Sequence, residues 1–214
     1  DGEMDVVFLI DSSGSIRQSR FEIFKGFVKD IIASLDIHPG SGHVGVMTYS
    51  DDIKIEFKLG DYQTGADTAH AVDMITYRAG RTNTAEALQA LREMFTEENR
   101  DRPDVPNYAI LVTDGVSTVN EEETLPEAVI TRMAGIHVII VCAEADPNSL
   151  ELKGIASPPV TENIFAVNRF DDVPTLVDDV VAAICDGGSW ILLHTSTVFN
   201  LIVFLQIMMN ALAI

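Results

Sequence analysis

The chain has 214 residues, of which 47% are hydrophobic and 22% charged, a composition typical of a globular protein with a sizeable core. Its formal net charge is −19 and its pI is near 4.4, which excludes nucleic acid and argues against anionic membrane surfaces as partners. Cations and basic protein surfaces are favoured instead.

The first predicted element is a strand that ends in a cluster of small oxygen-bearing side chains. Residues 6–10 form an uncharged apolar run, which indicates a strand buried on both faces. Asp11, Ser13 and Ser15 follow at alternating positions and present one carboxylate and two hydroxyls. Such hard oxygen donors suit Mg2+ or Mn2+, and open α/β sheets bind ligands beyond the carboxyl ends of their strands. The segment therefore predicts a metal site, although Asp11 alone is equally typical of a helix N-cap.

The rest of the chain alternates between helical and strand patterns. Residues 21–35 carry apolar side chains at spacings of three and four, and residues 53–59 alternate apolar with charged positions, as in an exposed antiparallel edge strand. The other predicted elements are strands over 43–49, 108–112, 137–142 and 164–167, helices over 65–75, 87–95, 122–134 and 173–184, and a loop over 96–106. The order predicts an α/β fold: a doubly wound, mostly parallel six-stranded sheet with one antiparallel edge strand and helices on both faces.

A second predicted strand also ends in aspartate, in the sequence Thr113-Asp114-Gly115. In a doubly wound sheet the strands that lead to Asp11 and Asp114 are expected to be neighbours at the topological switch point. The loop that ends in Gly80-Arg81-Thr82-Asn83 brings a hydroxyl to the same edge, and Asn83 and Thr84 are expected to cap the helix that follows. The predicted metal site comprises Asp11, Ser13, Ser15, Thr82 and Asp114.

These three separated pieces, Asp-x-Ser-x-Ser, a loop threonine before a helix, and Thr-Asp-Gly, resemble the von Willebrand factor type A family. The resemblance covers about residues 5–186, and the strand end Tyr49-Ser50-Asp51 is similar to that of collagen and matrilin members. It implies a Rossmann-like fold of this family with a metal-ion-dependent adhesion site. One mild departure is Ala85, where members often have glycine.

The resemblance also implies how the metal is held. Ser13 and Ser15 would be direct ligands, Thr82 a direct ligand in the ligand-bound form, and Asp11 and Asp114 would act mainly through water. Mostly neutral ligands leave the metal electrophilic, so it takes a further carboxylate from an acidic residue of a partner. Mg2+ is the expected ion, with Mn2+ or Ca2+ as alternatives.

We expect an extracellular adhesion or matrix module whose partner is collagen or another matrix protein. An enzyme is not expected, because the sequence has neither a nucleophile elbow nor a phosphate-binding loop and its histidines are scattered. One alternative is a structural module for matrix assembly, with an unused metal site and an acidic surface that binds Ca2+ or mineral. Another is an intracellular member of the family, favoured if Cys142 and Cys185 are both reduced.

The chain divides into a domain over residues 1–187 and an apolar segment over 188–214. Residues 190–214 carry no formal charge, and a helical bilayer span takes about 20 residues. Three interpretations stay open: a removable lipid-anchor signal, a true membrane span and an unrelated tail. We expect contact with a membrane only through this segment, if it is retained. Cys142 is expected in the core, while Cys185 is a candidate for pairing with a cysteine outside this sequence.

Overall fold

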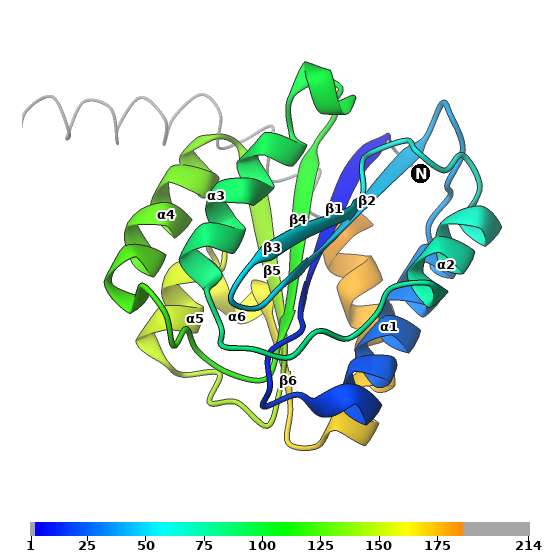
Figure 1. The fold of residues 1–214 in the computed structure, drawn as a ribbon. Helices are drawn as coiled ribbons and strands as arrows, with labels where there is room; N and C mark the ends of the chain where they lie inside the picture. Colours follow the sequence, from blue (N-terminus) through cyan, green and yellow to red (C-terminus); the bar gives the residue numbers. More distant parts are fainter. Residues whose placement is uncertain (1–2, 186–214) are drawn as a thin grey trace, which may run out of the picture.

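Six strands form a sheet with the order β3-β2-β1-β4-β5-β6 in the computed structural model, which describes residues 3–185 (Figure 1). The parallel strands are β1 (Met4–Asp11), β2 (Gly42–Tyr49), β4 (Asn107–Thr113), β5 (Ile136–Ala143) and β6 (Ile164–Val167), and β3 (Ile53–Phe57) runs antiparallel to β2. This arrangement confirms the predicted doubly wound sheet with one antiparallel edge strand.

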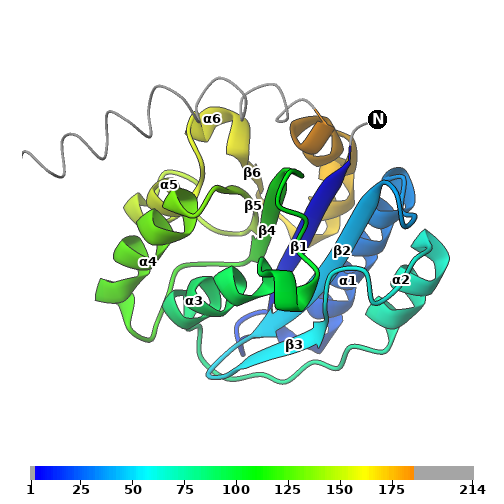
Figure 2. The ribbon, with the colours of Figure 1, turned by 90° about the horizontal axis from the view of Figure 1, so that it is seen from above.

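Helices cover both faces of the sheet (Figures 1 and 2). On one face lie α1 (Arg17–Ser34), α2 (Gly65–Asp73) and the 3-10 helix η2 (Phe170–Leu176), which continues as α-helix over residues 177–185. The opposite face carries α3 (Thr84–Met94), α4 (Glu121–Met133) and α5 (Leu150–Ile155). Two short elements, η1 (Glu97–Asn99) and α6 (Val160–Asn163), precede β4 and β6.

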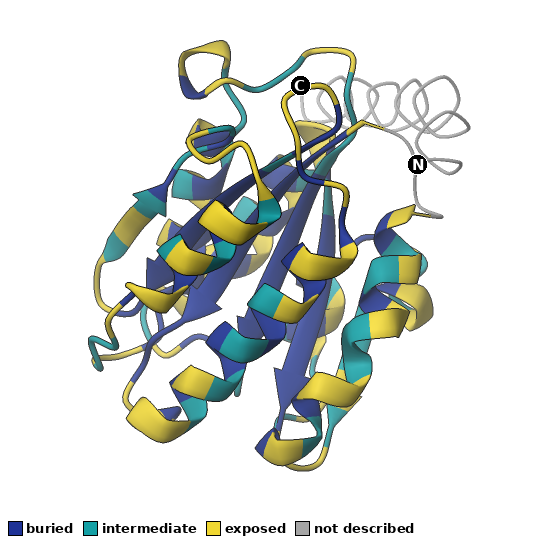
Figure 3. Cartoon of the chain, turned by 90° about the vertical axis from the view of Figure 1, so that its right-hand side faces the viewer, coloured by how far each residue is buried: buried dark blue, intermediate teal, exposed yellow. Residues whose placement is uncertain are grey.

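The central strand β1 is the axis of the core, because every one of its eight residues is buried. Val6, Phe8 and Ile10 pack among the residues of α1 and η2, whereas Val7 and Leu9 pack on the opposite side with those of α3 and α5. Figure 3 shows the consequence: the strands are buried almost throughout, and exposure is concentrated on the outer faces of the helices. A strand buried on both faces explains the continuous apolar run that the sequence shows.

The structure differs from the sequence prediction mainly in the short elements. The prediction missed α5 and α6, and the stretch over 96–106 that was expected to be a loop contains η1. The predicted helix over 173–184 begins instead with 3-10 geometry at Phe170. Elements of three to six residues are too short to establish a helical period, so apolar spacing carries no signal for them.

The predicted apolar segment over 188–214, with the boundary at 187, lies outside the described residues. Within residues 3–185 no helix is both long and apolar enough to cross a membrane. Cys142 is buried, as expected, and Cys185 is exposed.

A buried ion pair fastens the start of β1 to the segment that precedes β4. The Asp5 carboxylate is fully buried and accepts hydrogen bonds from the Arg102 backbone N–H at 3.0 Å, from Nε at 3.0 Å and from Nη2 at 2.6 Å. The same guanidinium donates to the carbonyl oxygens of Met4 and Ser41 at 2.8 and 2.7 Å. Arg102 therefore links the chain at the starts of β1 and β2 around the Asp5 carboxylate, which has no access to water.

We predict that Arg102→Ala lowers the free energy of unfolding by about 3–5 kcal/mol, because it leaves the Asp5 carboxylate buried without its counter-charge. Arg169→Ala is the matched control, since Arg169 pairs with Asp171 at 3.1 Å but both side chains are 71% exposed. Such surface pairs contribute less than about 1 kcal/mol. Urea denaturation of the two variants measures the difference, and equal losses would contradict the role given to Arg102.

Candidate metal centre

The predicted site residues lie where the winding of the sheet reverses. β1 pairs in parallel with both β2 and β4, and the chain leaves β1 toward β2 but leaves β4 toward β5. The loops after β1 and β4 therefore diverge and leave an open edge between them. Because Ile10 lies beside Val112 in this register, the strand ends at Asp11 and Thr113 are adjacent. The expected neighbourhood of the two strand ends is confirmed.

Asp11 is the buried anchor of this edge, with no exposed surface. Its Oδ1 accepts the Ser13 backbone N–H at 2.8 Å, and its Oδ2 accepts the Thr113 hydroxyl at 2.8 Å. The N-cap alternative for Asp11 is wrong, because Ile16 occupies that position of α1. The carboxylate folds the following loop back on itself instead of capping a helix.

The two serines and Asp114 form a chain of hydrogen bonds at the surface of the edge. The Oγ atoms of Ser13 and Ser15 lie 3.0 Å apart, and the Ser15 hydroxyl donates to Asp114 Oδ1 at 2.9 Å. Since Ser15 has only one hydroxyl proton, Ser13 must be the donor in the first bond. The two hydroxyl oxygens are thereby held side by side, with the Ser13 proton directed toward Ser15 Oγ and the Ser15 proton toward the Asp114 carboxylate.

The loop that carries Thr82 is tied to the loop after β1 by hydrogen bonds to main-chain carbonyl oxygens. The Gly14 N–H donates to the Gly80 carbonyl oxygen at 2.8 Å, and the Tyr77 hydroxyl donates to the Ser13 carbonyl oxygen at 3.0 Å. Gly80 has φ +115°, and a Cβ there would lie 2.6 Å from an Asp51 carboxylate oxygen. Only glycine suits this close approach.

Thr82 itself is clamped through its backbone to the loop after β4. Its N–H donates to the Thr118 hydroxyl at 3.0 Å, and its carbonyl oxygen accepts the Thr118 N–H at 2.8 Å. Its hydroxyl forms no hydrogen bond with any described residue, so the lone pairs of this oxygen remain available to coordinate a metal ion. The predicted helix cap is confirmed for Asn83, whose side chain accepts the Glu86 N–H at 3.3 Å; Thr84 is the first residue of α3.

Two residues that support the site were not predicted from the sequence. Thr113 holds the second oxygen of Asp11. Tyr49 pairs with Asp11 across β1 and β2, and its hydroxyl is buried without a hydrogen-bond partner in the described chain. The available signal was positional: both residues are the last of their strands, beside Asp11, but only the strand order shows which strands are adjacent.

Burial governs the electrostatics of the two carboxyl groups. Desolvation raises the pKa of Asp11 from 3.8 to about 6, against the hydrogen bonds from Ser13 and Thr113, which lower it. The pKa of Asp114 is also raised, chiefly by burial, while the hydrogen bond from Ser15 lowers it. Burial likewise raises the pKa of the Tyr49 hydroxyl, so it stays neutral. The positive charge of Arg20 lowers the pKa of Asp114, but burial outweighs this effect. Neither carboxylate accepts a hydrogen bond from a basic side chain of the described residues.

The chemistry of the donors fits a hard divalent cation. Hydroxyl and carboxylate oxygens are the ligands of Mg2+, Ca2+ and Mn2+, whereas softer metals prefer thiolate and imidazole. No cluster of three or more His, Cys, Asp and Glu side chains occurs among residues 3–185. The candidate site instead combines two carboxylates with three neutral hydroxyls, those of Ser13, Ser15 and Thr82.

Comparison with known proteins identifies the family. Residues 5–179 match the model of the von Willebrand factor type A domain. The chain belongs to this family. This membership agrees with the sheet order and confirms the resemblance found in the sequence.

Similar proteins include collagen and matrilin chains. The chain is 32% identical over 181 residues to the collagen alpha-6(VI) chain of Homo sapiens, which covers 85% of this chain and 8% of that one. It is 35% identical over 191 residues to matrilin-3 of Gallus gallus, covering 87% of this chain and 41% of that one. The chain thus spans less than half the length of either relative.

Solved structures show the same fold. Proximal thread matrix protein 1 from the mussel byssus aligns with a TM-score of 0.80 and 27% identity, over 86% of this chain and 49% of that one. A second structure of that protein, described with a zinc-occupied MIDAS motif, aligns with a TM-score of 0.79, 25% identity, and 86% and 48% coverage. In that neighbour, therefore, the MIDAS motif holds zinc.

The raised pKa of Asp11 predicts a distinct pH dependence for the metal-stripped protein. Because the folded state binds this proton more tightly than the unfolded state, the stabilisation is complete below pH 3.8 and is lost as pH rises through about 6. Between pH 5 and pH 7 we expect a loss of about 1 kcal/mol.

Chemical denaturation with EDTA present measures this loss as the difference between the wild type and Asp11→Asn, which cancels the other titrating groups. The free energy of unfolding of the wild type should fall relative to that of Asp11→Asn as the pH rises from 5 to 7. A difference that is constant between pH 5 and pH 7 would contradict the buried environment of Asp11.

Proposed function

We propose that the domain is an extracellular adhesion module that binds an acidic side chain of a matrix protein, such as collagen, through a Mg2+ ion. The observation that carries the proposal is the hydrogen-bonded series Ser13–Ser15–Asp114 beside the buried Asp11 carboxylate. This arrangement places the neutral hydroxyl oxygens of Ser13 and Ser15 at an open edge of the sheet, close to the negatively charged carboxylates of Asp11 and Asp114.

Each residue has a part in this proposal. The hydroxyl oxygens of Ser13, Ser15 and Thr82 would hold the metal directly, and Asp11 and Asp114 would act through water. When bound, the metal supplies a Lewis-acidic position that accepts a carboxylate oxygen. Neutral hydroxyl ligands leave most of the ionic charge uncompensated, so the attraction for an anionic oxygen of a partner stays strong.

The kind of ion follows from the donors. Mg2+ prefers oxygen ligands in octahedral geometry and keeps several waters, which suits three hydroxyls with water-mediated carboxylates. Zinc occupies the site in the mussel protein, which supports a divalent ion there. Mn2+ and Ca2+ remain the alternatives to be compared in the same titration.

The relatives support the partner class and the location. They are named collagen VI and matrilin chains, and the structural neighbours are called thread matrix proteins. Proteins of this kind belong to the extracellular matrix, which favours a matrix partner and an extracellular location for this chain. None of them is named as an enzyme, which agrees with a binding role in which catalysis has no part.

We predict that Asp114→Ala weakens Mg2+ binding about 10- to 100-fold, the usual effect of removing a partner that orients the metal's ligands. Calorimetric titration of Mg2+ into the metal-stripped chain measures the affinity. Asp30→Ala is the control, since Asp30 is an exposed aspartate on α1 whose side chain makes no hydrogen bond to a described residue. Equal affinities for the two variants, or no saturable binding to the wild type, would refute the metal site.

Adhesion itself is tested on immobilised collagen with Mg2+ or with EDTA. We expect binding that EDTA abolishes and that Asp114→Ala loses, while Asp30→Ala retains it. If Mg2+ binds but adhesion is unaffected by either treatment, the alternative of a structural assembly module with an unused metal site gains support. Light scattering with and without Ca2+ then measures whether the acidic surface promotes assembly.

A further inference from the structure

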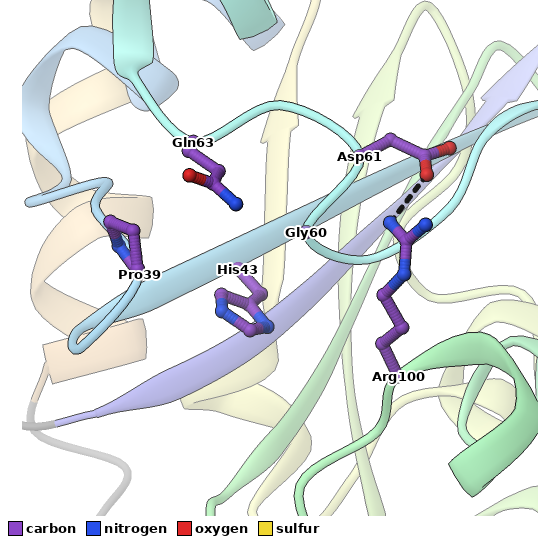
Figure 4. A pocket seen from close by; sticks show the side chains of 6 residues that line it. All are labelled: Pro39, His43, Gly60, Asp61, Gln63 and Arg100. Carbon is purple, nitrogen blue, oxygen red and sulfur yellow. Dashed lines mark hydrogen bonds and ion pairs between the residues drawn. The ribbon is translucent and has the colours of Figure 1, made fainter.

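Buried polar atoms without a hydrogen-bond partner in the described chain occur at both ends of β2. At its start, His43 Nδ1 lies beside a cavity of about 440 Å3 (Figure 4). The charged side chains that line this cavity, Arg100 and Asp61, pair with each other at 2.5 Å, so their charges compensate one another. At the other end of β2, the unpartnered atom is the hydroxyl oxygen of Tyr49, next to the candidate site residue Asp11.

Tyr49 belongs to a row of three polar side chains that crosses the end of the sheet. It pairs with Asp11 of β1, and Asp11 accepts the hydroxyl of Thr113, the last residue of β4, at 2.8 Å. The residues two positions earlier in each of these strands belong to one core cluster, together with residues of α3 and α5. Because side chains at alternate positions share a face of a sheet, the three polar side chains lie on the face that α3 covers.

The Tyr49 hydroxyl lies among groups of the candidate metal centre. Its side chain is only 1% exposed. Burial raises the pKa of this hydroxyl most, the negative charges of Asp11 and Asp114 raise it further, and the hydroxyls of Thr113 and Thr84 lower it. Groups from β1, β4 and the start of α3 are therefore close to this oxygen, yet none of them forms a hydrogen bond with it.

A buried hydroxyl without a partner costs free energy that a phenylalanine at the same position would not cost. The direct partners nearby are already engaged, since Asp11 Oδ1 accepts the Ser13 N–H and Oδ2 accepts the Thr113 hydroxyl. Each carboxylate oxygen still has a second lone pair. A water molecule beside Asp11 can use that lone pair and bind the Tyr49 hydroxyl at the same time.

We propose that Tyr49 is a positioning residue of the candidate metal centre, whose hydroxyl binds a water molecule that enters with the metal ion. This inference rests on the proposed metal site and adds to it a residue outside the set of candidate ligands. In that proposal Asp11 acts through water, and Mg2+ keeps several of its waters when it binds to a protein. Such a water has two protons, one for the Asp11 carboxylate and one for the Tyr49 oxygen. Tyr49 thereby orients the water through which Asp11 holds the ion.

Tyr108 provides a matched control within the same sheet. It is also 1% exposed, and its hydroxyl also lacks a hydrogen-bond partner in the described chain. It lies at the start of β4, where its ring packs against that of His137. Five residues of strand separate it from Thr113, a distance of about 17 Å. Tyr108→Phe therefore removes the same atom from a buried position that is remote from the candidate ligands.

The test compares Tyr49→Phe with Tyr108→Phe in the full chain, with Mg2+ as the probe. In EDTA, urea denaturation should show both variants to be at least as stable as the wild type, because each loses an unsatisfied hydroxyl. Calorimetric titration should show Mg2+ binding weakened about tenfold by Tyr49→Phe and unchanged by Tyr108→Phe. A residue with a purely structural role would not combine retained stability with weaker metal binding.

Three results would overturn the inference. The first is a Mg2+ affinity of Tyr49→Phe equal to that of the wild type, and the second is an equal weakening by both variants. The third is a loss of stability of Tyr49→Phe in EDTA, since its hydroxyl would then have a partner in the metal-free protein. A wild-type chain that does not bind Mg2+ would instead refute the proposed metal site itself, so the two failures are distinguishable.

Discussion

The parallel pairing of β1 with β4 is the constraint on which the rest of the metal centre depends. It places the buried Asp11 carboxylate beside Thr113, whose hydroxyl takes one carboxylate oxygen while the Ser13 N–H takes the other. A fully desolvated carboxylate is costly unless it is hydrogen-bonded, so these two donors fix both the strand ends and the turn between them. Ser15 and Asp114 are then positioned relative to this turn, because the serine hydroxyls connect them to it.

The loop that carries Thr82 is also positioned by hydrogen bonds, here between segments that are far apart in the chain. It crosses from α2 to α3 over the end of β2, and its hydrogen bonds to the turn after β1 and to the loop after β4 join the three segments into one edge. These bonds use main-chain groups or side chains other than the candidate ligand hydroxyl of Thr82. The edge is therefore organised by contacts that do not compete with a metal for this oxygen.

The two ends of the sheet handle charge in different ways. At the N-terminal end, the Asp5 carboxylate is neutralised inside the protein by Arg102, and Arg100 and Asp61 pair next to the cavity. At the carboxyl end, Asp11 and Asp114 have no such arginine hydrogen-bonded to them among the described residues, and burial raises the pKa of both. An external cation would compensate that second pair, which supports the proposed metal and, through the metal, the proposed acidic side chain of a partner.

The sequence by itself determined the strands, the long helices and the identity of the candidate ligands. A fully buried strand needs an uninterrupted apolar run, and the abrupt change to Asp11, Ser13 and Ser15 marks its end without knowledge of any neighbour. Only the tertiary structure decided which groups support those ligands: the hydroxyl of Thr113 and the buried hydroxyl of Tyr49. Their positions depend on strand order and loop closure, which join residues far apart in the chain, whereas sequence periodicity reports only the local alternation of burial.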